Sequence, residues 1–110
     1  MVMFFTEHCP YCRKAAPFIE QMNREYAPKG LKTVGICLEE TSSSAADFSK
    51  DFGLTFPVAY KGQQVARRYG TQGVPFIYLL TKDHVVHNVW AGYDKQFDGP
   101  IKKGIEEIIK

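Results

Sequence analysis

The sequence predicts an α/β fold in which a central mixed β-sheet is flanked by helices. Its 110 residues suffice for one domain, residues 1–110, whose hydrophobic core needs no metal or disulfide to support it. Strand-like and helix-like segments alternate in the first half, which favours parallel strands joined by crossover helices. Two strand-like segments separated by a short turn follow in the second half and predict an antiparallel hairpin.

The first half of the chain predicts two strands and two helices. Residues 2–6 form a short apolar run typical of a buried strand, and residues 31–38 form a second one. Between them, residues 12–26 predict an amphipathic helix, which Pro17 should kink because it removes a backbone hydrogen bond. The buried face of this helix is expected to comprise Ala15, Phe18, Ile19, Met22 and Tyr26. The serines at 42–44 offer N-cap hydroxyls for a second helix.

The second half predicts a short helix, the hairpin and a terminal helix. Residues 56–60 form a short extended piece, and residues 63–69 a short helix. The strongest strand signal covers residues 74–81, which should pair across a two-residue turn with residues 84–91. A last helix is expected to begin at Asp98. Its apolar stripe comprises Ile101, Ile105, Ile108 and Ile109.

Composition excludes several classes of function. The formal net charge is only +2 and the basic residues are scattered, which argues against nucleic acid or a membrane surface as partner. The longest apolar runs, such as residues 76–80, fall far short of the roughly 20 residues of a membrane span. Residues 1–5 contain no basic region and no small-residue cleavage site, so no secretory signal is expected.

The chemistry of the sequence is concentrated in the run Cys9-Pro10-Tyr11-Cys12. A cysteine between a strand and a helix lies at the helix N-terminus, where unpaired N–H groups and the helix dipole favour a thiolate. Cys9 is therefore the expected nucleophile, and Cys12, one turn further on, should resolve the mixed disulfide that Cys9 forms. Cys37 lies inside an apolar strand segment and is expected to be an inert buried thiol.

Two alternatives to dithiol exchange with protein partners remain open at this point. The first is a metal-binding module or copper chaperone that uses Cys9, Cys12 and His8, although a structural zinc site needs about four ligands. The second is a glutathione-dependent reductase with a glutathione site near Tyr11 and Val74. The favoured dithiol chemistry requires no metal and no other cofactor.

Several separated features together resemble the thioredoxin superfamily. The C-P-Y-C run follows a hydrophobic strand, and Pro17 stands eight residues after Cys9, where thioredoxins carry a helix-kinking proline. The run Gly73-Val74-Pro75-Phe76 is similar to the cis-proline loop of that family. The resemblance spans essentially the whole chain and implies a thioredoxin-like fold with a cis bond before Pro75.

The resemblance also implies roles for residues around the cysteine pair. In the family, the residue before the cis-proline turns its backbone toward the cysteines and pairs with substrate. Val74 and Pro75 would take these roles here, together with Pro10 and Tyr11. His8 replaces the tryptophan usual before the first cysteine, and as an imidazolium it would favour the thiolate further.

Within the superfamily, the sequence is similar to the TlpA/ResA-like group, which inserts a strand and a helix after the first helix. Residues 31–57 resemble that insert. Members of the group carry an acidic residue at the position of Glu40, which would relay a proton to or from Cys12. Their N-terminal hairpin is absent here, which implies a truncated N-terminus.

The function implied is a thiol–disulfide oxidoreductase that reduces or exchanges disulfides in protein partners. An upstream redox partner should recharge the Cys9–Cys12 pair, and the protein is expected to be a monomer. The sequence leaves the compartment open. A trimmed form of an exported protein would work in the bacterial periplasm or elsewhere outside the cytoplasm, as the resemblance suggests, and an untrimmed protein would work in the cytoplasm.

Overall fold

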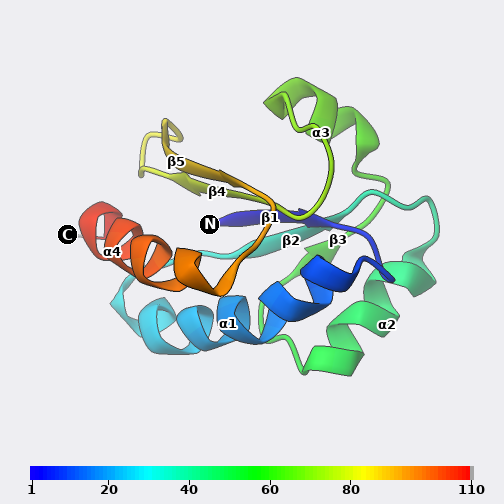
Figure 1. The fold of residues 1–110 in the computed structure, drawn as a ribbon, viewed down its shortest axis with the longest axis horizontal. Helices are drawn as coiled ribbons and strands as arrows, with labels where there is room; N and C mark the ends of the chain where they lie inside the picture. The colour runs from blue at the N-terminus through cyan, green and yellow to red at the C-terminus, as the bar shows by residue number, and fades with distance from the viewer. Residues whose placement is uncertain (110) are drawn as a thin grey trace.

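The computed structural model describes residues 1–109, which form one five-stranded sheet with helices on both faces (Figure 1). In chain order the elements are β1 (Val2–Phe5), α1 (Pro10–Tyr26), the 3-10 turn η1 (Ala27–Lys29), β2 (Val34–Cys37), α2 (Ser42–Phe52), β3 (Val58–Ala59), α3 (Gln63–Tyr69), β4 (Phe76–Leu80), β5 (Val86–Ala91), the 3-10 turn η2 (Lys95–Phe97) and α4 (Asp98–Ile108).

The sheet is mixed, as the alternation of segments predicts. Its strand order is β3-β2-β1-β4-β5. β1, β2 and β3 run parallel, whereas β4 is antiparallel to β1 and to β5. The expected hairpin is therefore confirmed. β1 occupies the middle of the sheet, and its carboxyl end lies beside the carboxyl end of β2 and the start of β4.

Two apolar clusters hold the layers together. Helices α1, α2 and α4 cover one face of the sheet, and α3 covers part of the other (Figure 1). Side chains alternate along β1, so Met3 and Phe5 enter the large core under the three helices while Phe4 enters a smaller cluster with Ala66 of α3. The ring of Phe5 stacks on Phe48 of α2 with 4.1 Å between centroids.

Several boundaries differ from the sequence-based expectations. α1 begins at Pro10 instead of residue 12, because Cys9 itself is the N-cap. The prediction that serines 42–44 cap α2 is wrong: Thr41 is the N-cap, and the helix already begins at Ser42. β2 starts only at Val34 and β5 only at Val86. The turn between β4 and β5 is longer than two residues, since the Thr81 N–H donates to the Val85 carbonyl oxygen at 2.8 Å.

The predicted apolar faces of the helices are largely buried. On α1, Phe18 is half-buried, and the other expected positions Ala15, Ile19, Met22 and Tyr26 are fully buried. On α4, Ile101 and Ile105 are fully buried and Ile108 and Ile109 half-buried. Pro17 lies inside α1, and the kink that it should cause stays a prediction.

The segment that resembles an insert contributes a strand to the interior of the sheet and leads into its edge strand. Residues 31–57 contain β2 and α2, and β2 is an inner strand paired with β1. The short edge strand β3 follows directly and pairs with β2 through Gly35 and Ile36.

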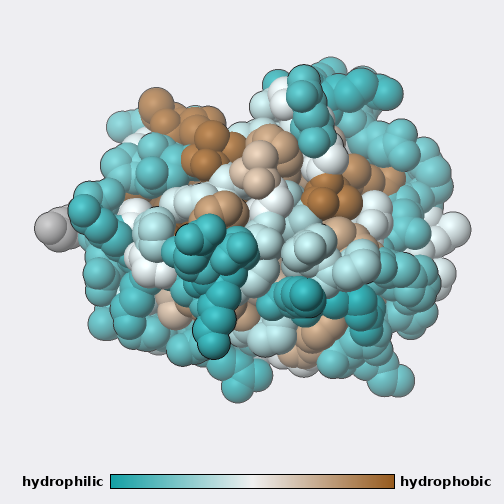
Figure 2. All heavy atoms as spheres, in the orientation of Figure 1, coloured by the Kyte–Doolittle hydropathy of each residue, from teal (hydrophilic) through white to brown (hydrophobic). Residues whose placement is uncertain are grey.

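Exposed apolar side chains gather over the β4–β5 hairpin, at the upper left of Figure 2, where Val85, Val86 and Val89 are exposed. Within residues 1–109, none of the helices has both the length and the apolar character needed to cross a lipid bilayer.

A buried carboxylate fastens α1 to the segment that leads into β3. Glu20 is only 6% exposed. Its oxygens accept hydrogen bonds from the Thr55 N–H (2.8 Å), the Thr55 hydroxyl (2.7 Å) and Arg24 Nε (2.6 Å). Burial by itself would raise the pKa of Glu20, but the bonds from the Thr55 N–H, Arg24 and the Thr55 hydroxyl outweigh burial and lower it.

Replacing this carboxylate should make the fold less stable in a pH-dependent way. Glu20→Gln is expected to lower the free energy of unfolding near neutral pH by about 1–3 kcal/mol, because buried donors lose a charged acceptor. Since the pKa of Glu20 is lower in the folded state, its contribution is complete above the ordinary value of 4.5 and is lost as the pH falls through the folded value. Denaturant titrations at neutral and acidic pH should therefore show the difference from wild type shrinking in acid.

The matched control is Glu25→Gln on the exposed side of the same helix, which removes only a surface ion pair with Lys102. An equal loss of stability in the two variants, or a difference independent of pH, would contradict this account of Glu20.

Candidate functional site

The first cysteine of the C-P-Y-C run caps α1 with its own sulfur. Cys9 has an extended backbone (φ −64°, ψ 117°), and its Sγ accepts a hydrogen bond from the Cys12 N–H at 3.2 Å. Pro10 occupies the start of the helix, where its missing N–H costs no helical bond. The sulfur of Cys9 thus stands at the positive end of the α1 dipole, as the spacing predicts.

The two cysteines differ sharply in their exposure. Cys9 is half-buried, whereas Cys12 is completely buried, and both are free thiols. Burial, followed by the hydrogen bond to Cys9, raises the pKa of Cys12 far above its ordinary value. A partner can therefore reach Cys9 directly, but it can reach Cys12 only through Cys9.

The peptide bond between Val74 and Pro75 is cis, as the resemblance implies. Pro75 is buried and Val74 half-buried, and both come immediately before β4. Because Phe76 pairs with Phe4 near the end of β1, the cis bond lies beside the segment that runs from β1 to Cys9. Val74 and Cys9 also pack against the same large core.

Three residues next to Cys9 in the chain are exposed to solvent. His8 is exposed, with its Nε2 3.6 Å from Glu7 Oε1. Pro10 is exposed, and the Tyr11 side chain is 56% exposed, with Lys14 Nζ 5.0 Å from its ring centroid. The exposed surface next to the Cys9 sulfur therefore includes His8, Pro10 and Tyr11.

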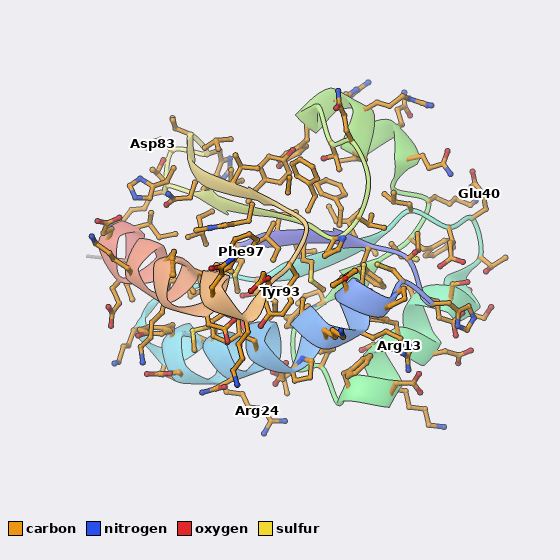
Figure 3. All side chains as sticks on the ribbon, viewed as in Figure 1. Arg13, Arg24, Glu40, Asp83, Tyr93 and Phe97 are labelled. Carbon is orange, nitrogen blue, oxygen red and sulfur yellow. The ribbon has the colours of Figure 1, made fainter. Side chains whose placement is uncertain are left out.

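The carboxylate that contacts the active-site loop is Glu39. Its Oε1 accepts the Glu7 N–H at 2.6 Å and lies 3.6 Å from the Cys37 sulfur. Glu40 is exposed at the edge of the molecule (Figure 3), and no contact joins it to either active cysteine among residues 1–109. The sequence analysis missed Glu39, although alternation along β2 could have found it. Continuing the alternation of β2 past its end would put residue 39 on the same side as residue 37, which is buried.

Cys37 is fully buried in β2, opposite Phe5 of β1. Burial raises the pKa of its thiol to about 11, and the nearby Glu39 and Glu7 carboxylates add to the effect of burial. Its thiol is therefore poorly suited to attack a disulfide.

No cluster within residues 1–109 brings together three or more His, Cys, Asp or Glu side chains that could hold a metal ion. The metal-binding alternative therefore gains no support from the geometry around Cys9, Cys12 and His8.

Known proteins with similar sequences carry one recurring name. The family described as Redoxin matches residues 1–104. Thiol-disulfide oxidoreductase ResA of Bacillus thuringiensis (strain Al Hakam) is 32% identical over 103 residues, which are 91% of this chain and 60% of the relative. ResA of Geobacillus thermodenitrificans is 27% identical over 106 residues, which are 96% of this chain and 60% of the relative. The chain thus spans about three fifths of the length of these relatives.

Solved structures with similar folds support the architecture. A putative thiol:disulfide interchange protein DsbE from Chlorobium tepidum superposes with a TM-score of 0.91 at 26% identity, covering 99% of this chain and 78% of that one. StoA from Bacillus subtilis superposes with a TM-score of 0.76 at 24% identity, covering 94% of this chain and 78% of that one. The expected thioredoxin-like fold is confirmed, and because the family match extends over residues 1–104, the chain belongs to the Redoxin family.

Proposed function

We propose that this chain is a thiol–disulfide oxidoreductase that reduces or exchanges disulfides in protein partners through Cys9 and Cys12. One observation carries the proposal: a half-buried sulfur caps α1 while a second, fully buried sulfur lies one helical turn away. The names of the ResA and DsbE relatives support the same chemistry.

The reaction transfers two electrons in two exchanges. The Cys9 thiolate attacks one sulfur of the partner disulfide, which forms a mixed disulfide and releases the other partner sulfur as a thiolate that takes up a proton. Cys12 then loses its proton and attacks the Cys9 sulfur, which forms the Cys9–Cys12 disulfide and releases the second partner thiol. Because burial raises the pKa of Cys12, its proton must leave as the attack proceeds.

An upstream dithiol partner would restore the reduced pair, and a monomer suffices for every step. In this scheme Pro10, Tyr11 and Val74 form the surface that meets the partner, and the buried Pro75 supports the Val74 backbone from below. The backbone of Val74 would pair with the partner chain next to its cysteine. An exposed His8 beside the thiolate would favour the charged sulfur when protonated.

We expect the two adjacent glutamates, Glu39 and Glu40, to play different roles. Glu40 as a proton relay stays a prediction that no contact of its side chain supports. We propose that Glu39 is a positioning residue, because its carboxylate holds the Glu7 N–H, two residues before Cys9. The carbonyl oxygen of Glu39 also accepts the Lys61 N–H at 2.8 Å, which fastens this corner to the segment after β3.

Thiol reactivity should follow the order of exposure. When the reduced protein meets a limiting amount of iodoacetamide at neutral pH, Cys9 is expected to be alkylated first. Cys12 and Cys37 should react slowly, because burial raises the pKa of both thiols, that of Cys37 to about 11. Peptide mass spectrometry measures the distribution, and unfolding in denaturant should make the three rates similar. If Cys37 were alkylated as fast as Cys9 in the folded protein, thiol reactivity would not follow exposure and the prediction would be wrong.

Substitution of each cysteine should separate their roles. Cys9→Ser is expected to abolish reduction of insulin disulfides, and Cys12→Ser to accumulate mixed disulfides visible on non-reducing gels, because the resolving thiol is missing. Cys37→Ala is the matched control and should retain turnover and form no trapped adducts. Full activity in Cys9→Ser would refute the assignment of the nucleophile.

The two acidic neighbours can be compared directly. Glu39→Ala should lower kcat/KM for insulin roughly tenfold or more, because losing a hydrogen bond to a charged acceptor costs about 1.5–3 kcal/mol. Glu39→Gln keeps an acceptor for the Glu7 N–H and should restore most of the rate, which a purely charged or proton-relay role would not allow. Glu40→Ala is the control. Wild-type kinetics in Glu39→Ala would rule out the positioning role.

A further inference from the structure

Arg13, in the first turn of α1, bridges two other parts of the chain. Its Nη1 donates a hydrogen bond to the Glu7 carbonyl oxygen at 2.9 Å, and its Nη2 donates to Asp51 Oδ2 at 2.9 Å. The guanidinium carbon also lies 4.9 Å from the ring centroid of Phe52. The Arg13 side chain thus joins the loop that leads into α1 to the end of α2, and Figure 3 shows it between these two helices.

Both backbone groups of Glu7 are held by side chains from other parts of the chain. Arg13 binds its carbonyl oxygen, and Glu39 Oε1 accepts its N–H at 2.6 Å. The Cys9 N–H lies 3.4 Å from the Thr6 carbonyl oxygen and closes a turn over the same loop. A residue fixed at both its donor and its acceptor loses the backbone freedom that a loop would otherwise keep. Arg13 and Glu39 therefore form a clamp on Glu7, the Arg13–Glu39 clamp.

The residue before Glu7 contacts the buried sulfur of the cysteine pair. Burial, followed by the hydrogen bond to Cys9, raises the pKa of Cys12, whereas the backbone N–H of Thr6 lowers it. A backbone N–H lowers the pKa of a thiol when it donates to the sulfur and stabilises the thiolate. Because Cys12 is completely buried, water does not take the place of this donor. The Thr6 N–H thus serves the Cys12 sulfur from the loop that the clamp holds.

The second exchange is the step in which negative charge develops on Cys12. The Cys12 S–H proton leaves and a bond forms between the sulfurs of Cys12 and Cys9. The bond from Cys9 to the partner breaks, so the partner departs as a thiolate. A buried thiolate is costly unless donors already point at it, and a donor fixed in advance needs no reorganisation during the attack. The first exchange places no charge on Cys12 and gains nothing from this donor.

We propose that Arg13 is a positioning residue for the resolving step, because the Arg13–Glu39 clamp holds the Thr6 N–H against the Cys12 sulfur. The inference rests on the proposed exchange between Cys9 and Cys12 and gives its second step a donor of its own. Loss of the clamp should therefore slow resolution and spare the attack by Cys9.

An equimolar amount of dithiobis(nitrobenzoate) separates the two steps, since each step releases one coloured aryl thiolate. Attack by Cys9 releases the first, and attack by Cys12 on the mixed disulfide releases the second. In Arg13→Ala, stopped-flow absorbance should show a second phase roughly fivefold slower than in wild type, the size expected for one lost hydrogen bond. The first phase should keep its wild-type rate. Arg67→Ala removes the same charge from exposed α3, on the other face of the sheet, and should change neither phase.

Arg13→Lys distinguishes the bridge from its charge. Lysine keeps the positive charge, but a single ammonium group lacks the planar fork that reaches Glu7 and Asp51 together. The second phase should therefore stay slower than in wild type. Full recovery of the second phase in Arg13→Lys, or equal slowing of both phases in Arg13→Ala, would overturn the proposal.

Amide hydrogen exchange of the reduced protein measures the clamp without any redox step. The N–H groups of Thr6 and Glu7 should exchange faster in Arg13→Ala than in wild type, and at the wild-type rate in Arg67→Ala. Unchanged exchange in Arg13→Ala, or faster exchange with an unchanged second phase, would overturn the role of Arg13. Faster exchange in Arg13→Ala, combined with a wild-type protein that never releases the second thiolate, would support the clamp and refute the proposed function.

Discussion

The hydrogen bond from the Cys12 N–H to the Cys9 sulfur is the interaction on which the site depends. It makes the Cys9 side chain serve as the N-cap of α1, so the sulfur is held at the positive end of the helix dipole. Cys12 lies one turn further along the helix, and its side chain is buried in the core. One structural requirement of the helix thereby provides both the orientation of the Cys9 sulfur and the burial of Cys12.

Because β1 lies in the middle of the sheet, the strands on either side of it place further residues close to the Cys9 N-cap. β2 runs parallel to β1, so the residues after both strands emerge at the same edge of the sheet, where Glu39 reaches the Glu7 N–H. β4 runs antiparallel, so the residues before it arrive at the same edge, and the cis bond before Pro75 lies there. A sheet of this order therefore collects one loop, one carboxylate and one proline at a single point.

The exposed surface beyond the cysteines has a chemistry of its own. A groove of about 500 Å³ between α1 and the segment that joins β5 to α4 combines aromatic side chains with two lysines and two aspartates. Its two aspartates accept hydrogen bonds from the Tyr93 hydroxyl and the Gln96 N–H, which order the turn before α4 and leave both carboxylates charged.

The sequence alone determined the features that depend on near neighbours in the chain. The C-P-Y-C spacing placed a sulfur at a helix start, apolar periodicity gave the buried faces of α1 and α4, and the Gly73–Phe76 run gave the cis-proline by resemblance. Local signals were less reliable at element ends, where Thr41 and not a serine caps α2, because capping depends on which residue first leaves the helical backbone.

Tertiary structure alone decided which of two adjacent glutamates faces the active-site loop, and that α1 and the segment before α4 enclose a groove. Both outcomes arise between residues far apart in sequence. Glu39 and Glu7 are separated by 32 positions, and their contact exists only because β1 and β2 pair in a particular register. Register and helix docking are set by the packing of the whole core, a property that no short stretch of sequence contains.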